Sequence, residues 1–438
     1  MMLRARHILS TTGATLASGG FALGLTILVA RLLTPEQNGH YAQFVLVFNL
    51  VYIGLNFGLG PASTFFVASN RASVRAVSRL NLGVLVGLTC LLVAAAWLIH
   101  GSGLARSVEG LLKMPPTVLY VGLIAGILLL SINQVMAILM GGHRYDLVNA
   151  LNVSRAALPL VLVGVLSLAC VPSVSLVAIA QSVAMGLALL LAVWTARRSL
   201  LSADTGAING STRYLWAMLG YGGLVYLSNL LHYLAMRGLL LLLSYFSAPE
   251  SVGFLSLALL FLEVTLLLPS AIGQLVFPQS SIAGFNHAAL DLVLRVNMYI
   301  GLALVSLILL FAQPIVALLL GEAYAPVAQT LIHLGPSVVL LAVPRILSQL
   351  LSGQGHPQYP LMAAVLSLLL GTFVAIWAIP RWGYLGAAWV TNLVSAITAT
   401  VTLIGYCRVH RIRLAQILVP QHQDWQSIRR LATRTARG

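Results

Sequence analysis

The sequence predicts an all-α, polytopic membrane protein whose twelve transmembrane helices form two six-helix bundles related by pseudo-twofold symmetry. Three observations lead to this fold class: an apolar composition, a chain that divides into long apolar spans, and an internal repeat. Of the 438 residues, 59% are hydrophobic and 8% are charged, and the mean hydropathy is +0.97. Because soluble domains carry about 25% charged residues, this composition is typical of a membrane protein.

A helix needs about 20 apolar residues to cross a bilayer, and the chain divides into twelve such stretches. They lie near 10–33, 39–68, 80–100, 117–140, 147–170, 174–195, 214–246, 251–278, 291–320, 326–352, 358–379 and 383–407. The seventh and ninth stretches are longer than a bilayer requires, which predicts that these helices tilt or protrude into water. Pro159, Pro269, Pro314 and Pro344 fall inside spans and predict bends.

Basic residues predict the orientation of these spans. The 24 basic and 9 acidic residues give a formal charge of +15. The basic residues lie in loops between apolar spans without interleaved aromatic residues, so nucleic acid is not an expected partner. With the N-terminus inside, the cytoplasmic side holds seventeen of the arginines and the opposite side holds four basic residues. The seventeen are Arg4, Arg6, Arg71, Arg75, Arg79, Arg144, Arg197, Arg198, Arg213, Arg295, Arg408, Arg411, Arg413, Arg429, Arg430, Arg434 and Arg437; the four are Arg31, Arg106, Lys113 and Arg381. This bias predicts that both termini are cytoplasmic.

The chain repeats two landmarks at one offset of about 214 residues. The connection 35–39, between spans one and two, and the connection 249–253, between spans seven and eight, both read Pro-Glu-x-x-Gly. A Gly-His pair followed by a tyrosine stands after spans four and ten, at Gly142 and Gly355. An even number of spans per half predicts that both halves insert the same way up, with a substrate path between them. The predicted units are a bundle 1–198, a cytoplasmic linker 199–213, a bundle 214–407 and a basic cytoplasmic tail 408–438.

The seventh and eighth spans form a predicted hairpin that carries two charges. Arg237 lies twelve residues before Pro249, and Glu263 lies fourteen residues after it. At about 1.5 Å per residue, both charges lie roughly 18–21 Å from the turn, so they reach a common depth and can form an ion pair. Tyr226, Asn229, Tyr233 and Arg237 follow one another at helical spacing and share one face, which makes them candidate substrate-binding residues. A polar seam between helices is the alternative interpretation of that face.

Two more arginines, Arg155 and Arg345, fall inside the spans. If Glu263 pairs with Arg237, these two remain unbalanced, and they either face a central cavity or extend to the interface. A positive cavity suits an anionic ligand, because guanidinium groups match phosphate oxygens. Asn49 and Tyr52 on the second span are candidate cavity residues as well, although packing between helices is the commoner role of such groups. The lone His232 is interpreted as a packing or interfacial residue.

Signatures of catalysis are missing from the sequence. It has no Gly-rich phosphate loop, no paired carboxylates and no nucleophile elbow, and its three cysteines have no motif spacing. We therefore expect no enzymatic activity, no catalytic residues, no metal site and no cofactor.

Several stretches resemble one known family over nearly the whole chain. They are Ala30–Tyr41, Arg237–Leu241, Leu268–Ile272, Gly321–Pro326 and Ile379–Ala388. These stretches resemble the Wzx-type polysaccharide and O-antigen flippases of the multidrug/oligosaccharidyl-lipid/polysaccharide (MOP) exporter superfamily. The resemblance implies two bundles around a cleft that opens alternately to each side. It also implies an undecaprenyl-diphosphate-linked oligosaccharide as substrate, the bacterial inner membrane as location, and polymerases and glycosyltransferases as neighbouring partners.

The sequence departs from the family at one position. The family often has an acidic residue just before the arginine of its seventh helix, where this chain has Met236. A coupling role for such a carboxylate is therefore in doubt, and Glu263 is the candidate substitute.

Three other functions stay open at this point. A drug or cation antiporter of the same superfamily would favour acidic residues in its cavity, where only Glu263 is available. A membrane polymerase or ligase for lipid-linked sugars would carry a large external loop, whereas the longest one here, 100–116, is short. A purely structural membrane protein is the third alternative, against which the internal repeat argues.

Overall fold

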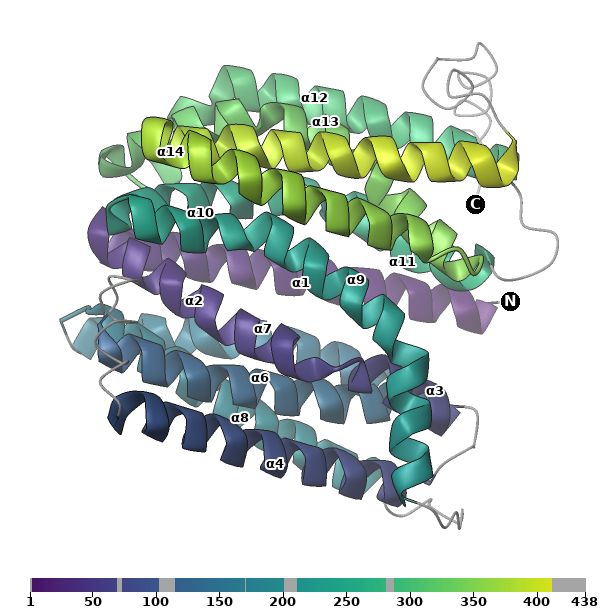
Figure 1. The fold of residues 1–438 in the computed structure, drawn as a ribbon. Helices are drawn as coiled ribbons and strands as arrows, with labels where there is room; N and C mark the ends of the chain where they lie inside the picture. The colour runs from purple at the N-terminus through teal and green to yellow at the C-terminus, as the bar shows by residue number, and fades with distance from the viewer. Residues whose placement is uncertain are drawn as a thin grey trace.

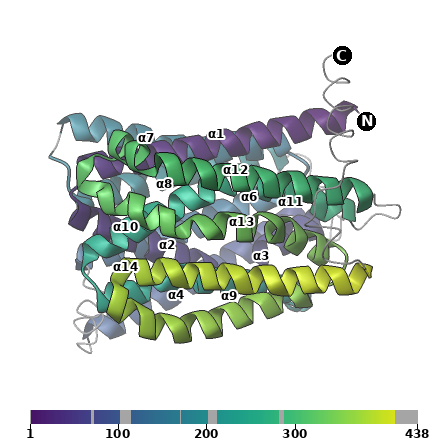
Figure 2. The same cartoon turned by 90° about the horizontal axis from the view of Figure 1, so that it is seen from above.

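The computed structural model describes residues 2–68, 73–101, 115–169, 171–200, 211–280 and 287–411. Every regular element in these ranges is a helix, and the long helices run along one common direction in two stacked groups (Figures 1 and 2). The first helix begins and the last helix ends at the same end of the molecule. We call this end the inner end and the opposite end the outer end, after the predicted orientation.

The first half of the chain forms six passes between the two ends. Its helices are α1 (Met2–Leu32), α2 (Pro35–Asn56), α3 (Leu59–Ala68), α4 (Val74–Gly101), α6 (Pro116–Gly141), α7 (Tyr145–Ala169) and α8 (Val174–Leu200). The helices α2 and α3 together make the second pass. The helices of the first half lie in the lower group of Figure 1, except α1, which runs between the two groups.

The second half forms the other six passes. Its elements are α9 (Ser211–Phe246), α10 (Pro249–Thr265), α11 (Leu267–Ser280), α12 (His287–Leu319), the short 3-10 helix η1 (Glu322–Tyr324), α13 (Ala325–Gly353) and α14 (Gln358–His410). The helix α14 makes two passes, because its backbone leaves the helical region at Gly383 (φ 55°, ψ −132°). Nine of the described helices are long and apolar enough to cross a membrane, which confirms a multi-pass membrane protein.

The second span of each half is broken into two helices; a bend was predicted at Pro269 in the second half, whereas none was predicted in the first half. The break between α2 and α3 lies at Phe57 (φ 44°) and Gly58 (φ 72°), and glycine tolerates this left-handed conformation. The break between α10 and α11 lies at Leu266, three residues before Pro269. Proline has no N–H to offer the carbonyl four residues earlier, so the helix cannot continue unchanged. By contrast, Pro314 stays inside one continuous helix.

Each half has its own hydrophobic core. The first core runs from Leu25 on α1 to Ala192 on α8. The second joins α9, α10, α12, α13 and α14 and takes in Ala30, Ala42 and Leu46 from the first half. The two cores therefore meet near the outer end, where these three residues lie. A smaller cluster joins Val276 on α11 to α12, α13 and α14. The limits predicted for the two units and the linker stay a prediction.

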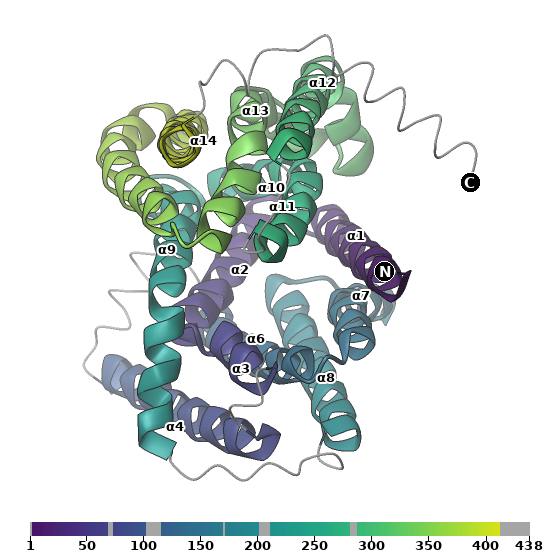
Figure 3. The ribbon, with the colours of Figure 1, turned by 90° about the vertical axis from the view of Figure 1, so that its right-hand side faces the viewer.

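The packing within the halves repeats, as expected for two copies of one bundle. The first span packs on the fifth in one half (α1 on α7), and its counterpart α9 packs on α14 in the other. Likewise α2 packs on α6, and α10 packs on α13. The helices α2 and α10 also pack on each other, so they join the two halves (Figure 3).

The repeated Pro-Glu-x-x-Gly connections start these two helices at the outer end. In each, proline occupies the first helical turn and glutamate follows it, which suits the helix N-terminus. A Cβ atom on Gly39 would lie 1.9 Å from the carbonyl oxygen of Pro249. Reciprocally, a Cβ atom on Gly253 would lie 3.1 Å from the carbonyl oxygen of Pro35. The two copies of the motif therefore pack against each other, backbone to backbone, and only glycine allows this approach.

Side chains reinforce this junction with hydrogen bonds between the halves. Arg31 donates to the carbonyl oxygens of Leu318 and, at 2.8 Å, of Leu319; the Tyr324 hydroxyl donates to the carbonyl of Leu33 at 2.9 Å; and the Gln43 amide donates to the Ser244 hydroxyl at 2.5 Å. We call this set of contacts, together with the paired glycines, the outer seal.

Candidate functional site

A polar pocket lies between helices of the second half, deeper in the molecule than the outer seal. It has a volume of about 210 Å³. Its lining consists of Ile53, Asn229, His232, Tyr233, Met236, Arg237, Leu259, Leu262, Glu263, Leu266, Leu341 and Arg345. Ile53 on α2 is the residue of this lining that comes from the first half, so the pocket borders the junction between the halves.

Helical periodicity brings these residues to one place. The α9 residues stand three, four, seven and eight positions after Asn229, which is one face of a helix. Leu259, Leu262 and Glu263 of α10, with Leu266 just after its end, repeat this spacing. The third wall is α13, which contributes Leu341 and Arg345 one helical turn apart.

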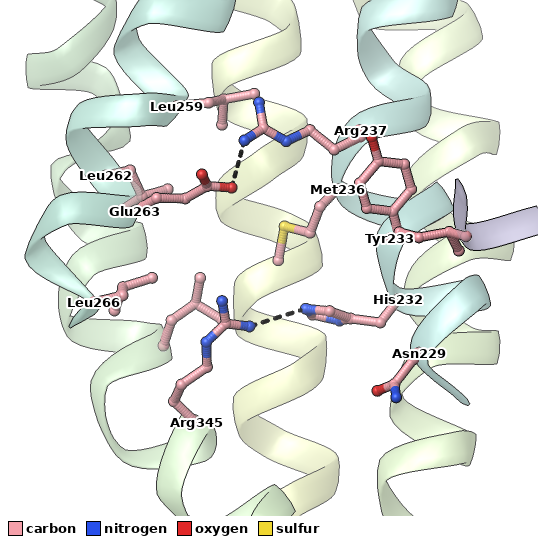
Figure 4. A pocket seen from close by; sticks show the side chains of 12 residues that line it. Asn229, His232, Tyr233, Met236, Arg237, Leu259, Leu262, Glu263, Leu266 and Arg345 are labelled. Carbon is pink, nitrogen blue, oxygen red and sulfur yellow. Dashed lines mark hydrogen bonds and ion pairs between the residues drawn. The ribbon is translucent and has the colours of Figure 1, made fainter. Parts of the chain in front are cut away.

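The ion pair predicted between Arg237 and Glu263 is present. The Arg237 guanidinium donates to the Glu263 carboxylate across the pocket (Figure 4). The side chain of Arg237 is 20% exposed and that of Glu263 is 50% exposed, so the pair lines an accessible space rather than a closed core. Each charge offsets the cost of placing the other in an apolar layer, which is about 2.5–3.5 kcal/mol on insertion scales.

Arg345 also points into the pocket, but its direct partners are neutral. Its Nε donates to the Ser270 hydroxyl at 3.3 Å, and its Nη1 donates to His232 Nε2 at a long 3.4 Å (Figure 4). A guanidinium carries only donors, so His232 must accept through an unprotonated nitrogen. Glu263 acts on Arg345 through space, while its direct contact is with Arg237.

The pocket is therefore positive overall. Two arginines and one carboxylate line it in the described part of the chain. The carboxylate is already engaged by Arg237, which leaves Arg345 able to bind an incoming anion. Such a site favours phosphate oxygens, which match the planar fork of a guanidinium.

His232 is a pocket residue that the sequence interpretation missed. It stands three positions after Asn229 and next to Tyr233, so the same helical face includes it. An isolated histidine is commonly a packing residue, and His232 was interpreted in that way although its spacing places it on the polar face of the helix. Its partner Arg345 is 113 residues away in the chain, so no local pattern links the two.

The other candidate residues lie outside the pocket lining. Asn49 donates to the carbonyl of Val45 in its own helix at 2.8 Å. Tyr52 on α2 and Arg155 on α7 are half-buried in the first half and within electrostatic range of each other. Arg155 is therefore not part of this pocket's lining, unlike Arg237 and Arg345.

Tyr226 occupies a position between the halves. Its hydroxyl donates to the carbonyl of Gly54 at 2.7 Å, and its ring lies 5.8 Å from the ring of Phe57. It shares a helix face with Asn229 and Tyr233, as predicted, but it does not line the pocket.

Comparisons with known proteins bear on family and fold. The family described as polysaccharide biosynthesis protein matches residues 5–283. A search of curated proteins found no match.

Solved structures with a similar fold cover almost the whole chain. The lipid II flippase MurJ in an inward closed conformation has 14% identity and a TM-score of 0.73, over 93% of this chain and 88% of its own. An inward-facing multidrug resistance MATE family transporter of the MOP superfamily has 17% identity and a TM-score of 0.66, over 92% and 98%. The eukaryotic MATE transporter AtDTX14 has 15% identity and a TM-score of 0.66, over 95% and 98%. These likenesses confirm the MOP-type fold of twelve helices in two bundles.

Proposed function

Because this chain belongs to the family of polysaccharide biosynthesis proteins, we propose that it is a flippase for a saccharide carried on a lipid diphosphate. The substrate is an undecaprenyl-diphosphate-linked oligosaccharide, and it moves from the inner to the outer leaflet of the bacterial inner membrane by alternating access. Both termini are cytoplasmic. The product serves O-antigen, capsule or exopolysaccharide synthesis, with polymerases and glycosyltransferases as neighbouring partners.

The observation that carries this proposal is the positive pocket with Arg345 held by neutral partners. A diphosphate cannot cross hydrocarbon without a polar path, whereas its lipid tail can remain in the bilayer. Arg345 supplies a charged fork for one phosphate, and Asn229, Tyr233 and His232 supply neutral polar groups beside it. Arg237 becomes available to a second phosphate only when Glu263 releases it.

The charges of the same pocket argue against the alternative function, an antiporter for cationic drugs. Such a carrier needs a carboxylate free to receive a cation. In the described lining the carboxylate is Glu263, and Arg237 already neutralises it. A cation entering this pocket would face two guanidinium groups against one carboxylate.

The pocket as it stands is too small for the whole headgroup. Its volume of about 210 Å³ lies below the range of about 300–1,000 Å³ that is common for small-molecule sites. A phosphate group fits this space, but an oligosaccharide does not. Loading therefore requires the two halves to separate around the pocket.

The test is a flipping assay with purified protein in lipid vesicles. The substrate is an undecaprenyl-diphosphate-linked oligosaccharide with a fluorescent sugar, and a membrane-impermeant quencher reports which leaflet holds the sugar. Arg345→Ala should slow flipping about ten- to 150-fold, because a hydrogen bond to a charged group contributes about 1.5–3 kcal/mol. Arg237→Ala should also slow it, while the same substrate on a monophosphate should be a poor substitute.

Arg381→Ala is the matched control. Arg381 is exposed and lies over the ring of Trp377, outside the pocket lining. The Arg381→Ala substitution removes one guanidinium group and leaves the pocket lining unchanged, so the flipping rate should equal that of the parent protein. Equal rates for Arg345→Ala and Arg381→Ala would contradict the proposal. Transport of tetraphenylphosphonium in place of the tagged lipid would instead identify a cation carrier.

A further inference from the structure

Two layers of contacts between the halves bracket the pocket along the membrane normal. Along α9, Tyr226 comes first from the inner end, the pocket residues Asn229 to Arg237 follow, and Ser244 of the outer seal comes last. Along α2 the order is reversed: Gln43 belongs to the outer seal, and Ile53 of the pocket lining directly precedes Gly54, which accepts the Tyr226 hydrogen bond. In depth, the pocket therefore lies between the outer seal and the Tyr226 contacts.

In the described part of the chain, the two layers consist of different kinds of contact. The outer seal joins the backbones of two helices at paired glycines and adds hydrogen bonds from three side chains. The inner layer holds the Tyr226 hydrogen bond and the contact of its ring with Phe57. The inner part of α9 lies beside α3 and α4 of the first half at this level (Figure 3). For α9 and α2 to part toward the inner end, the Tyr226 hydrogen bond to Gly54 must break.

Tyr226 bonds to a carbonyl at a weak point of the second span. Gly54 lies in the last turn of α2, where helix carbonyls lose their partners within the helix. The ring contact of Tyr226 is with Phe57, the residue at which the helix breaks with φ 44°. The tyrosine therefore ties α9 of one half to the break in the other half.

We infer that Tyr226 is the inner gate residue, and that the empty protein opens to the inner end by releasing the Tyr226–Gly54 bond while the outer seal stays closed. This inference rests on the proposed function and reassigns Tyr226, which the sequence interpretation placed among the substrate contacts. The gate admits the diphosphate head from the inner leaflet, and the break at Phe57 lets the inner end of the second span move aside.

The test measures access to the pocket from each side without any substrate. The three native cysteines are changed to alanine, and Met236→Cys places a thiol in the pocket lining. A membrane-impermeant maleimide is applied to inverted vesicles, which expose the inner side, and to spheroplasts, which expose the outer side. Tyr226→Phe keeps the ring and removes the hydroxyl, so labelling from the inner side should rise about two- to ten-fold, as expected for one lost hydrogen bond. Labelling from the outer side should not change.

Tyr41→Phe is the control for general loosening. Its hydroxyl donates to Gln181 at 2.8 Å within the first half, so the same atom is lost without affecting the junction. An unchanged inward rate for Tyr226→Phe, or an equal rise for Tyr41→Phe, would overturn the gate. Inorganic pyrophosphate added to the same assay tests the proposed function separately, because it should protect the thiol of the parent protein. If pyrophosphate fails to slow labelling of the parent protein while Tyr226→Phe still speeds it, the diphosphate pocket is refuted and the gate stands. If pyrophosphate slows labelling but Tyr226→Phe does not speed it, the gate is refuted and the pocket stands.

Discussion

A methyl group on Gly39 should force the outer seal open. The added Cβ would lie 1.9 Å from the carbonyl oxygen of Pro249 and 2.4 Å from its carbon. Ordinary contacts begin near 3.4 Å, so α2 and α10 must move apart there by about 1.5 Å, the difference between 3.4 and 1.9 Å. Both partners are backbone, so no rotamer change can relieve the overlap. Separation of the halves is the remaining response.

The size of this effect follows from the cost of overpacking. Inserting one methyl group into a well-packed core costs about 1–3 kcal/mol, and a backbone-to-backbone contact lies at the upper end of that range. Such a cost shifts the ratio of open to closed outer seals by about five- to 150-fold. Gly253→Ala should act in the same direction but more weakly, because its Cβ would lie 3.0 Å from the amide nitrogen of Gly39.

The assay measures labelling of a thiol inside the seal. Ser244→Cys, without the native cysteines, places the thiol at a side chain that is 1% exposed. In spheroplasts treated with an impermeant maleimide, adding Gly39→Ala should raise the labelling rate by at least five-fold.

Gly20→Ala on α1 serves as the matched control for this measurement. A Cβ atom there meets no heavy atom within 4 Å, yet the change of residue type inside a helix is the same. Each change stabilises its helix by about 1 kcal/mol through propensity alone, so a difference between them reports the clash. The reasoning is refuted if Gly39→Ala is labelled no faster than Gly20→Ala.

Three further outcomes are expected. Exchanging the pair, as Arg237→Glu with Glu263→Arg, should restore more flipping than either single change; equal defects in all three variants would dismiss the pairing as a functional unit. Asn392→Leu should lower the free energy of unfolding by about 1–3 kcal/mol, seen as a lower melting temperature in detergent, because it unpairs the α13 N–H and carbonyl that the Asn392 amide bridges. Asn133→Leu, whose amide bonds within its own helix, should cost less, and equal losses would contradict this account. Arg31→Ala removes the bonds to the end of α12 and should speed labelling in the outer seal by less than the glycine change does; a larger effect would place the main closure at the arginine.

Local patterns predicted much of this molecule. Hydropathy predicts spans because each residue contributes to membrane partition nearly independently of its partners. The Arg237–Glu263 pair was predictable for a related reason: two helices joined by a short turn are antiparallel, and equal distance from the turn means equal depth. The breaks in the second span of each half were harder to predict from the sequence. Phe57-Gly58 and Pro269 are visible in the sequence, but neighbouring helices determine whether a helix bends, breaks or continues there, and Pro314 continues.

Residues that share a helix face were grouped correctly but assigned to one role. Tyr226 and Asn229 stand three positions apart, yet one bonds across the junction and the other lines the pocket. A difference of one helical turn in depth separates a gate from a binding site. Periodicity reports the direction in which a side chain points, and it does not report what stands opposite at each level.

Composition, hydropathy and the repeated Pro-Glu-x-x-Gly connection are thus enough to establish a twelve-span membrane protein of two similar halves and one ion pair in its interior. Those properties depend on short stretches of chain and on the thickness of the bilayer. Packing between distant helices determined the rest: Arg345 lies beside His232, Arg155 lies outside the lining of their pocket, and Gly39 packs against Pro249. Such contacts depend on how each helix is rotated and translated against partners more than a hundred residues away, and only the assembled bundle sets these quantities.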